Sequence, residues 1–278
     1  MKPLEKIVQS LIINGTLTEQ PGLFYGKTGI AVFFFHYAHQ TRNEIAQNYA
    51  MELIVEIQKQ ISATTSARYD TGIAGIGVGF EYFLQNGFLT ADEDIFEDFD
   101  TRMFRAALYE PYPDLSLEGG LTGLGRYFIY RLRGKGQKTE NLHKALTHIT
   151  SEIVRKIKKK PVSENDKTDV YRFLHDLASI PEYTEKYSNA LQKCREWKCI
   201  AKPDIQKGFP YINFLQRLHI CQNYFNMDLT DEIGHEWKKW EETDDTLIDM
   251  GLLKGLSSNG LLHLTRLNKN NVSWFNLL

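Results

Sequence analysis

The sequence has few cysteines, no long hydrophobic run and no excess of charge of either sign. Its 278 residues include three cysteines, an odd number that argues against a disulfide framework. No apolar run approaches the roughly 20 residues that cross a bilayer, and the charged residues within positions 1–6 are unlike a signal peptide. With 33 basic and 35 acidic residues, composition gives no electrostatic case for nucleic acid. We therefore expect a soluble cytoplasmic protein with no membrane span and no nucleic-acid partner.

Common signatures of catalytic sites are missing as well. The chain contains no phosphate-binding loop, no Gly-x-Ser-x-Gly nucleophile elbow and no His-Glu-x-x-His metal motif. Alternation of apolar and polar residues, which is typical of half-buried strands, does not extend over any length. These absences exclude several familiar enzyme classes and favour an all-helical chain.

What the sequence does contain is a recurring glycine pattern. Three glycines at positions i, i+3 and i+5 precede an apolar run at Gly120, and the same spacing recurs at Gly72. Related patterns begin at Gly26, with alanine as the last member, and at Gly255, with serine in the middle. From Gly26 to Gly72 is 46 residues, from Gly72 to Gly120 is 48, and from Gly208 to Gly255 is 47. This period is typical of two-helix repeats, and the glycines predict a bare helix surface that another backbone can approach.

Each repeat is expected to pair a helix that is apolar on all sides with a helix that is apolar on one face. Residues 26–39 illustrate the first kind and residues 42–61 the second. Thr90 and Glu93 predict a capping box for a further one-sided helix. Six pairs predict an all-α fold, an (α/α)6 toroid of six inner and six outer helices, as a single domain over residues 1–278. An open helical solenoid is the alternative, but it would leave one face of each inner helix wet.

The segments that begin at Gly22, Gly72, Gly120 and Gly251 resemble those of the lanthionine synthetase C-like family, the cyclase component of lanthipeptide synthesis. The resemblance extends over the chain through its periodicity and is weak between about residues 134 and 221. It implies an (α/α)6 toroid whose central cavity is lined by the loops before the inner helices. In that family, a zinc ion on the cavity floor activates a peptide cysteine thiol for addition to dehydroalanine or dehydrobutyrine.

The chain departs from the family at the zinc ligands. The last repeat of the family reads Gly-Leu-Cys-His-Gly, whereas Leu253 and Lys254 occupy the two ligand positions here. The preceding repeat of the family supplies a cysteine, but residues 206–211 contain none. Because leucine cannot ligate zinc and lysine would place a cation there, we expect no zinc, no other cofactor and no zinc-dependent cyclase activity.

The cysteines do not rebuild a metal site elsewhere. Cys194 and Cys199 are five residues apart, and Cys221 follows His219 by two, so neither pair shares a helix face. We expect partly buried thiols and a core histidine in preference to a relocated zinc site.

The resemblance places a set of side chains at the mouth of the cavity, just before or at the inner helix starts. We expect these residues to bind substrate: Tyr25, Lys27, Tyr69, Asp70, Glu118, Tyr211, Asn213, Asp249 and Lys254. Asp70, Glu118 and His175 are the candidates for acid–base catalysis. For Asp70 and Asp114, an ordinary role in capping the following helix is the stronger interpretation. For Lys254, we expect an ion pair with Asp70, Glu118 or Asp249, in the role of the lost metal's charge.

Three functions remain open. We favour a pseudoenzyme of a peptide-modification system, which binds a peptide substrate or precursor peptide and works with a partner modification enzyme. The second is a metal-free enzyme that acts on a peptide or, by analogy with other (α/α)6 toroids, on a saccharide. The third is a scaffold with a filled cavity. The basic run at residues 155–160 offers a surface to an acidic partner, although cations are also favoured at a helix C-terminus.

Overall fold

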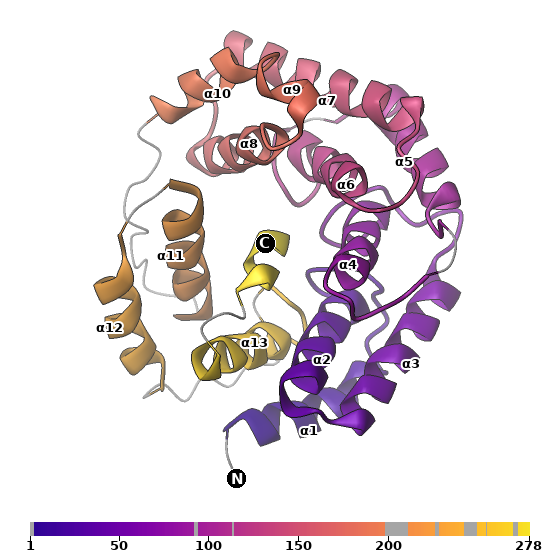
Figure 1. Ribbon diagram of the computed structural model, residues 1–278, viewed down its shortest axis with the longest axis vertical. Coiled ribbons are helices and arrows are strands. Elements are labelled where there is room, and N and C mark those ends of the chain that lie inside the picture. The colour runs from indigo at the N-terminus through magenta and orange to yellow at the C-terminus, as the bar shows by residue number, and fades with distance from the viewer. Residues whose placement is uncertain are drawn as a thin grey trace. The chain divides into compact units, whose positions relative to one another are not determined.

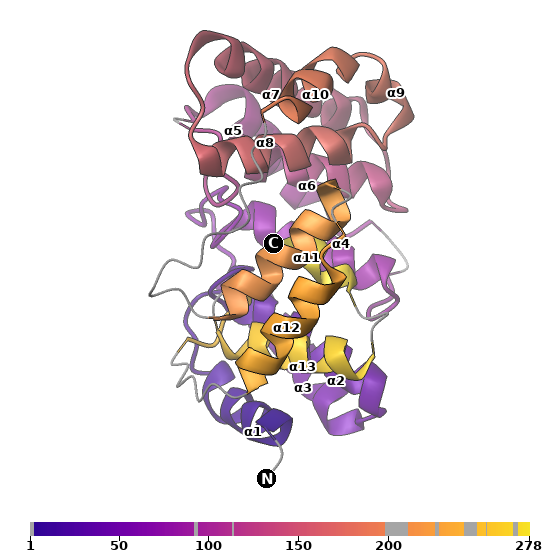
Figure 2. The same cartoon turned by 90° about the vertical axis from the view of Figure 1, so that its left-hand side faces the viewer.

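The chain folds into helices. The computed structural model describes residues 3–91, 94–112, 114–197, 211–225, 228–241, 249–253, 255–268 and 272–278. Within these residues every regular element is helical (Figures 1 and 2), which confirms the all-α prediction. The elements are α1 (Pro3–Gly15), α2 (Lys27–Thr41), α3 (Glu44–Gln60), α4 (Ile73–Gln85), α5 (Glu97–Tyr109), α6 (Leu121–Arg133), α7 (Glu140–Lys159), α8 (Glu164–Leu177), α9 (Pro181–Thr184), α10 (Ser188–Arg195), α11 (Tyr211–Phe225), α12 (Thr230–Glu241), α13 (Leu256–Leu267) and the 3-10 helix η1 (Ser273–Leu277). Over the described part of the chain, no helix combines the length and apolarity that a bilayer crossing requires.

Two compact units divide the chain. The first unit combines both chain ends, Met1–Ile61 and Ile200–Leu278, and the second unit is the middle, Ser62–Cys199. In the first unit, α2 packs against α3 and α13, and α11 packs against α12. In the second unit, α6 packs against α4, α7 and α8, and α8 packs against α10. The single domain over residues 1–278 stays a prediction.

The predicted alternation of buried and one-sided helices is present. In α2, the stretch from Ile30 through Phe35 is 0% exposed, so this helix is enclosed on all sides. The long helix α7 instead buries one stripe, which includes Leu142, Leu146 and Ile149. Burial of apolar surface is the main source of fold stability. In the inner helices α2, α4 and α6, most residues are buried.

The four glycine repeats start their helices through one shared backbone hydrogen bond. The first helical N–H donates to a carbonyl seven residues earlier, in the pairs Lys27–Gln20 at 2.9 Å, Ile73–Ser66 at 2.8 Å, Leu121–Asp114 at 3.3 Å and Leu256–Asp249 at 2.8 Å. The first glycine is the N-cap residue, as at Gly72 and Gly120, and no side chain caps these helices. A Cβ at Gly120 would collide with Asp114 and Ser116, so the tight loop requires glycine there. The expected capping of α4 by Asp70 and of α6 by Asp114 is therefore wrong.

The later glycines seat aromatic rings of a neighbouring inner helix. The ring of Tyr127 on α6 lies where a Cβ on Gly77 would be, and the ring of Phe173 on α8 lies similarly against Gly125. In the first unit, Phe33 on α2 occupies the same place against Gly260 on α13. The predicted bare helix surface is thus confirmed. At these three glycines, aromatic side chains occupy the space, and not the backbone of the neighbouring helix.

One helix start differs from the sequence prediction. The one-sided helix α5 begins at Glu97, with Phe96 as N-cap, and not directly after Thr90. Asp94 accepts from Phe96 N at 3.0 Å and bonds Arg131, which holds this stretch in a loop. Ahead of α10, Pro181 starts the separate four-residue helix α9.

The C-terminal segment forms a buried 3-10 helix that the sequence did not indicate. Trp274 Nε1 donates to Thr265 Oγ1 of α13 at 3.0 Å, and the Phe275 ring stacks on His219 of α11 at 4.4 Å between centroids. Burial lowers the pKa of His219 to about 4, as suits the core histidine that we expected.

Candidate functional site at the inner helix starts

The loops before neighbouring inner helices meet at equivalent repeat positions. In the second unit, the N–H groups of Tyr69 and Asp70 both donate to the carbonyl of Glu118, at 3.0 and 3.1 Å. In the first unit, the N–H groups of Leu252 and Leu253 donate to the carbonyl of Phe24, at 2.7 and 3.2 Å. The two contacts are equivalent. In each, the donors stand three and two residues before the first glycine of their own repeat, and the acceptor stands two residues before the first glycine of the adjacent repeat. The structure therefore brings together three predicted site residues, Tyr69, Asp70 and Glu118.

Asp70 forms a two-point ion pair with Arg68, a residue that the sequence did not single out. Arg68 Nε donates to Oδ1 at 2.8 Å and its terminal nitrogen donates to Oδ2 at 2.5 Å. Asp70 Oδ1 also accepts from the N–H of Thr71 at 2.8 Å. Asp70 is buried, whereas the Arg68 side chain is 48% exposed. The hydrogen bond with Asp70 raises the pKa of Arg68, so the guanidinium stays charged over the physiological range.

Tyr69 and Glu118 differ in exposure although their loops touch. Tyr69 is 1% exposed, and the Arg126 guanidinium carbon lies 6.0 Å from the centre of its ring. Glu118 is exposed, so its carboxylate is the group in this cluster that a ligand meets first. The cluster presents an exposed carboxylate and a half-exposed guanidinium beside each other.

Asp169 on α8 takes the place of a repeat glycine. Its Oδ2 accepts from the N–H of Leu117 at 2.8 Å, in the loop before α6. Phe173 fills the space at Gly125 in the same way as Tyr127 fills the space at Gly77, so Phe173 and Tyr127 occupy equivalent repeat positions. Asp169, four residues before Phe173, therefore corresponds to Gly123, four residues before Tyr127. Burial raises the pKa of Asp169 to about 6, against the nearby charges of Arg172 and Arg126.

His175, the third catalytic candidate, lies at the other end of α8. It is six residues, or about 9 Å of helix, beyond Asp169, and its Nδ1 is 4.0 Å from Asp176 Oδ1. Asp176 also binds the guanidinium of Arg126 at 3.3 Å. Burial opposes the charge of Asp176, but His175, Arg126 and Arg133 lower its pKa to about 2. His175 thus lies half-exposed beside the buried ion pair of Asp176 and Arg126, and not at the Asp70 loop.

Sequence reasoning missed Asp169 because its repeat lacks the glycines. A signal was nevertheless present, since Asp169, Arg172 and Asp176 follow an i, i+3, i+7 spacing along a helix that is otherwise apolar where it faces α6. Charged residues at that spacing on an inner helix predict a paired, buried network. Arg68, by contrast, stands in a loop where no periodicity applies.

In the first unit, the predicted residues occupy separate places. Lys27 begins α2 and is 2% exposed. Its charge adds to the effect of Lys59, which lowers the pKa of Glu56 on α3. Tyr25 is half-buried, with its ring edge-on to Phe24. Asp249 Oδ1 accepts from the N–H of Gly251 at 3.0 Å. The predicted ion pair of Lys254 and the side chains of Tyr211 and Asn213 lie outside the described residues.

Of the positions that the resemblance assigns to zinc ligands, the described part of the chain includes Leu253. Leu253 has no donor atom in its side chain, and its backbone N–H is bonded to Phe24. Among the residues that the structure describes, no three histidine, cysteine or acidic side chains form a group that could hold a metal ion. Cys194 is buried and Cys221 is half-buried, as expected, while Cys199 and positions 206–210 lie outside the described residues.

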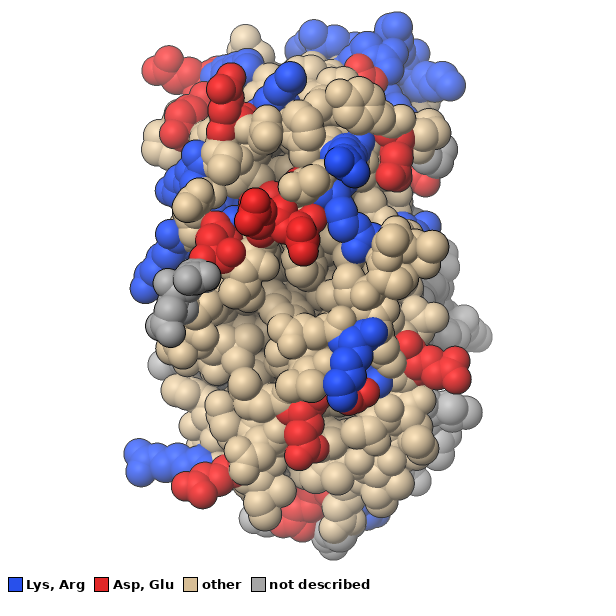
Figure 3. Space-filling view, turned by 90° about the vertical axis from the view of Figure 1, so that its right-hand side faces the viewer, with Lys and Arg blue, Asp and Glu red and all other residues tan. Residues whose placement is uncertain are grey.

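The surface charge is mixed where it can be seen. Figure 3 shows both signs of charge on the face that it draws, with several acidic residues grouped above the middle and several basic residues at the upper right. This distribution agrees with the net charge of −2. It offers no extended basic surface on that face for a polyanion.

Comparison with known proteins places the fold. Neither a scan against protein-family models nor a search of curated proteins returns a match. Among solved structures, the chain is similar to nisin cyclase, with 15% sequence identity and a TM-score of 0.56 over 100% of this chain and 98% of that chain. At this identity the likeness shows the fold alone, and it confirms the predicted class: the chain has the all-helical toroid fold of nisin cyclase.

Proposed function

We propose that the chain is a lanthionine synthetase C-like protein that binds a peptide at its inner helix starts and lacks zinc-dependent cyclase activity. The fold shared with a protein named as a cyclase supports the peptide-modification setting. The glycine loops of the sequence support the same family. A partner modification enzyme would then supply or receive the peptide, and Glu118 and Arg68 would offer it a carboxylate and a guanidinium.

One observation supports the proposed lack of cyclase activity. Leu253 stands where the family has a thiolate ligand, and its N–H is bonded to the Phe24 carbonyl in a loop contact repeated at Asp70. The loop therefore keeps the repeat geometry while the side chain has no lone pair for a metal. Without a metal-bound thiolate, a peptide cysteine stays mostly protonated at neutral pH.

A synthetic peptide with one cysteine and one dehydrobutyrine tests the proposal. Its affinity for the full chain is measured by calorimetry, and cyclisation is followed as loss of maleimide labelling of the thiol, with and without added zinc chloride. We expect binding, unchanged labelling in both conditions and at least fivefold weaker binding for Glu118→Gln. Glu182→Gln, another exposed glutamate, is the matched control. Absence of binding, or cyclisation that depends on zinc, would refute the proposal.

A metal-free enzyme is the second candidate, and the two α8 carboxyls favour it. Burial brings the pKa of Asp169 to about 6, while the arginines around Asp176 hold its pKa near 2. Carboxyls with separated pKa values are the usual basis of acid–base catalysis. If the chain is such an enzyme, maleimide labelling of the peptide thiol must be lost even in the presence of a metal chelator. The labelling must be retained when the Asp169→Asn variant replaces the natural chain.

A further inference from the structure

A large groove lies in the second unit at the opposite ends of α4 and α6 from the glycine loops. It is lined by the end of α4, by residues within 87–91 and 94–97, by one side of α5 and by residues between 131 and 142. Its volume is about 1290 Å³. Pockets for single small molecules have volumes of roughly 300–1,000 Å³, so this groove has room for a chain of several residues.

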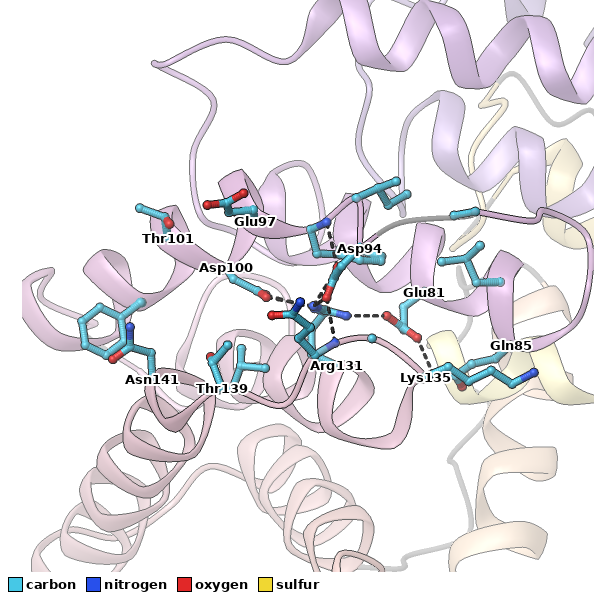
Figure 4. A pocket seen from close by; sticks show the side chains of 18 of the residues that line it. Glu81, Gln85, Asp94, Glu97, Asp100, Thr101, Arg131, Lys135, Thr139 and Asn141 are labelled. Carbon is cyan, nitrogen blue, oxygen red and sulfur yellow. Dashed lines mark hydrogen bonds and ion pairs between the residues drawn. The ribbon is translucent and has the colours of Figure 1, made fainter.

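The floor of the groove carries more negative than positive charge. Arg131, which is 0% exposed, bonds Glu81 at 3.1 Å, Asp94 at 2.9 Å and Asp100 at 2.9 Å. Figure 4 shows these three carboxylates turned toward the guanidinium in the middle of the groove. At the floor, this one buried cation faces three acids, while Glu97, Arg105 and Lys135 are further charged residues of the groove lining. Burial raises the pKa of Glu81 despite Arg131, whereas burial at Asp94 is outweighed by hydrogen bonds from Gln137 and Arg131, which lower its pKa.

The two aspartates of the floor are open to the groove. Their side chains are 18% exposed at Asp94 and 17% at Asp100, whereas that of Glu81 is 3% exposed. A cation that enters the groove therefore meets Asp94 and Asp100 first. Because the aspartates are partly buried, where the effective dielectric constant is lower, they attract such a cation more strongly than carboxylates at an open surface would.

The walls combine apolar side chains with amides and hydroxyls. Ile95 is 45% exposed and Tyr109 is 78% exposed, so both present apolar surface along the groove. Thr101, Thr139 and Asn141 lie toward one end of the groove, and Gln85 and Lys135 toward the other (Figure 4). Apolar anchors beside hydrogen-bonding groups are the composition of peptide-binding surfaces.

We propose that this groove binds an extended peptide segment with a basic residue over Asp94 and Asp100 and apolar residues on either side, against Ile95 and Tyr109. The inference rests on the proposed function, because it assumes that the ligand is a peptide. It adds a second contact, remote from the inner helix starts. The basic residue relieves the excess charge of the floor, and the flanking residues cover the exposed apolar walls.

Fluorescence anisotropy with two labelled seven-residue peptides tests the groove. One peptide has a central lysine between leucines, the other has glutamate in its place, and neither contains cysteine or a dehydro residue. We expect the lysine peptide to bind at least tenfold more tightly than the glutamate peptide. Ile95→Lys should weaken its binding at least tenfold, because the new cation opposes the ligand. Ile45→Lys, at an exposed isoleucine of α3, is the matched control and should change nothing.

Equal binding of the two peptides, or an unchanged affinity in Ile95→Lys, would overturn the groove proposal. Binding of calcium ions with no preference for the lysine peptide would overturn it as well, since the floor would then be a plain cation site. The two proposals fail separately. If the dehydrobutyrine peptide binds and the lysine peptide does not, the groove is wrong; the reverse result refutes the site at the inner helix starts.

Discussion

The N–H of Leu117 donates to the carboxylate of Asp169 at 2.8 Å and so ties the loop before α6 to the second turn of α8. Where the structure shows two other neighbouring loops in contact, the acceptor is a backbone carbonyl, as at Glu118 and Phe24. A side chain that can titrate has thus replaced a group that cannot. The charges around it are Arg172, Arg126 and Asp166.

Asp169→Asn is expected to change how stability depends on pH. The folded pKa of about 6 exceeds the ordinary 3.8, so the folded state binds this proton more tightly than the unfolded state does. The contribution of Asp169 to stability is therefore full below about pH 4 and is lost as the pH rises through 6. Asparagine keeps an acceptor for Leu117 and removes the buried charge. Urea unfolding from pH 4 to 8 should show the variant more stable at neutral pH, by up to about 3 kcal/mol. Parallel curves for the two proteins would contradict this.

Gly123→Ala is expected to destabilise the second unit. A Cβ at this position would meet the carbonyl of Leu117 and the Cβ of Tyr69, both of which belong to the loops of the candidate site. Because backbone cannot move aside as a flexible side chain can, we expect a loss of about 1–3 kcal/mol in urea unfolding. Gly234→Ala, on α12 with open space around it, is the control and should be neutral or stabilising. A tolerated Gly123→Ala would show that the two loops are not closely packed.

Arg131→Met is expected to be severely destabilising. The substitution leaves Glu81, Asp94 and Asp100 without the cation that binds all three. Removal of one partner from a buried ion pair costs about 3–5 kcal/mol. Arg155→Met, at an exposed arginine that pairs with Glu152 one turn away, should leave the midpoint of thermal unfolding almost unchanged. Similar midpoints of thermal unfolding for the two variants would mean that the buried network does not hold α4, α5 and α6 together.

Thr122→Val tests the buried hydroxyls at the helix starts. Thr122 is 1% exposed, and its hydroxyl donates to the carbonyl of Leu115 at 2.8 Å, as Thr28 does to Pro21 and Ser257 to Met250. Valine leaves that buried carbonyl with one donor fewer, at a cost of about 1–3 kcal/mol in the free energy of unfolding. Thr41→Val, whose hydroxyl bonds an exposed carbonyl at a helix end, should change stability much less.

The fold could be predicted from the sequence because one spacing governs several contacts at once. The glycines that follow Gly72 and Gly120 leave space that a ring of the neighbouring inner helix fills, so their period indicates both where the helices begin and how they pack. The positions of the loops before α2, α4, α6 and α13 could be predicted for the same reason. The assignment of Asp114 as a helix cap failed because a glycine in extended conformation starts the helix without a side-chain cap.

The candidate site was only partly predictable. Asp70 and Glu118 come together because they occupy the same repeat position, which the sequence displays. Arg68 and Asp169 owe their roles to contacts between repeats, and their pairing depends on side-chain directions that no local pattern encodes. The groove above Arg131 is formed by two loops whose course follows from buried charge and not from periodicity.

The hydrogen bonds from Leu252 and Leu253 to Phe24 join residues near opposite ends of the polypeptide. During synthesis, the loop that begins α2 leaves the ribosome long before the segment that completes it. The middle of the chain, Ser62–Cys199, is available earlier as a continuous stretch. Contacts of high sequence separation form slowly, so the middle should mature first, while the apolar surface of α2 waits for the last residues and depends on protection from aggregation until then.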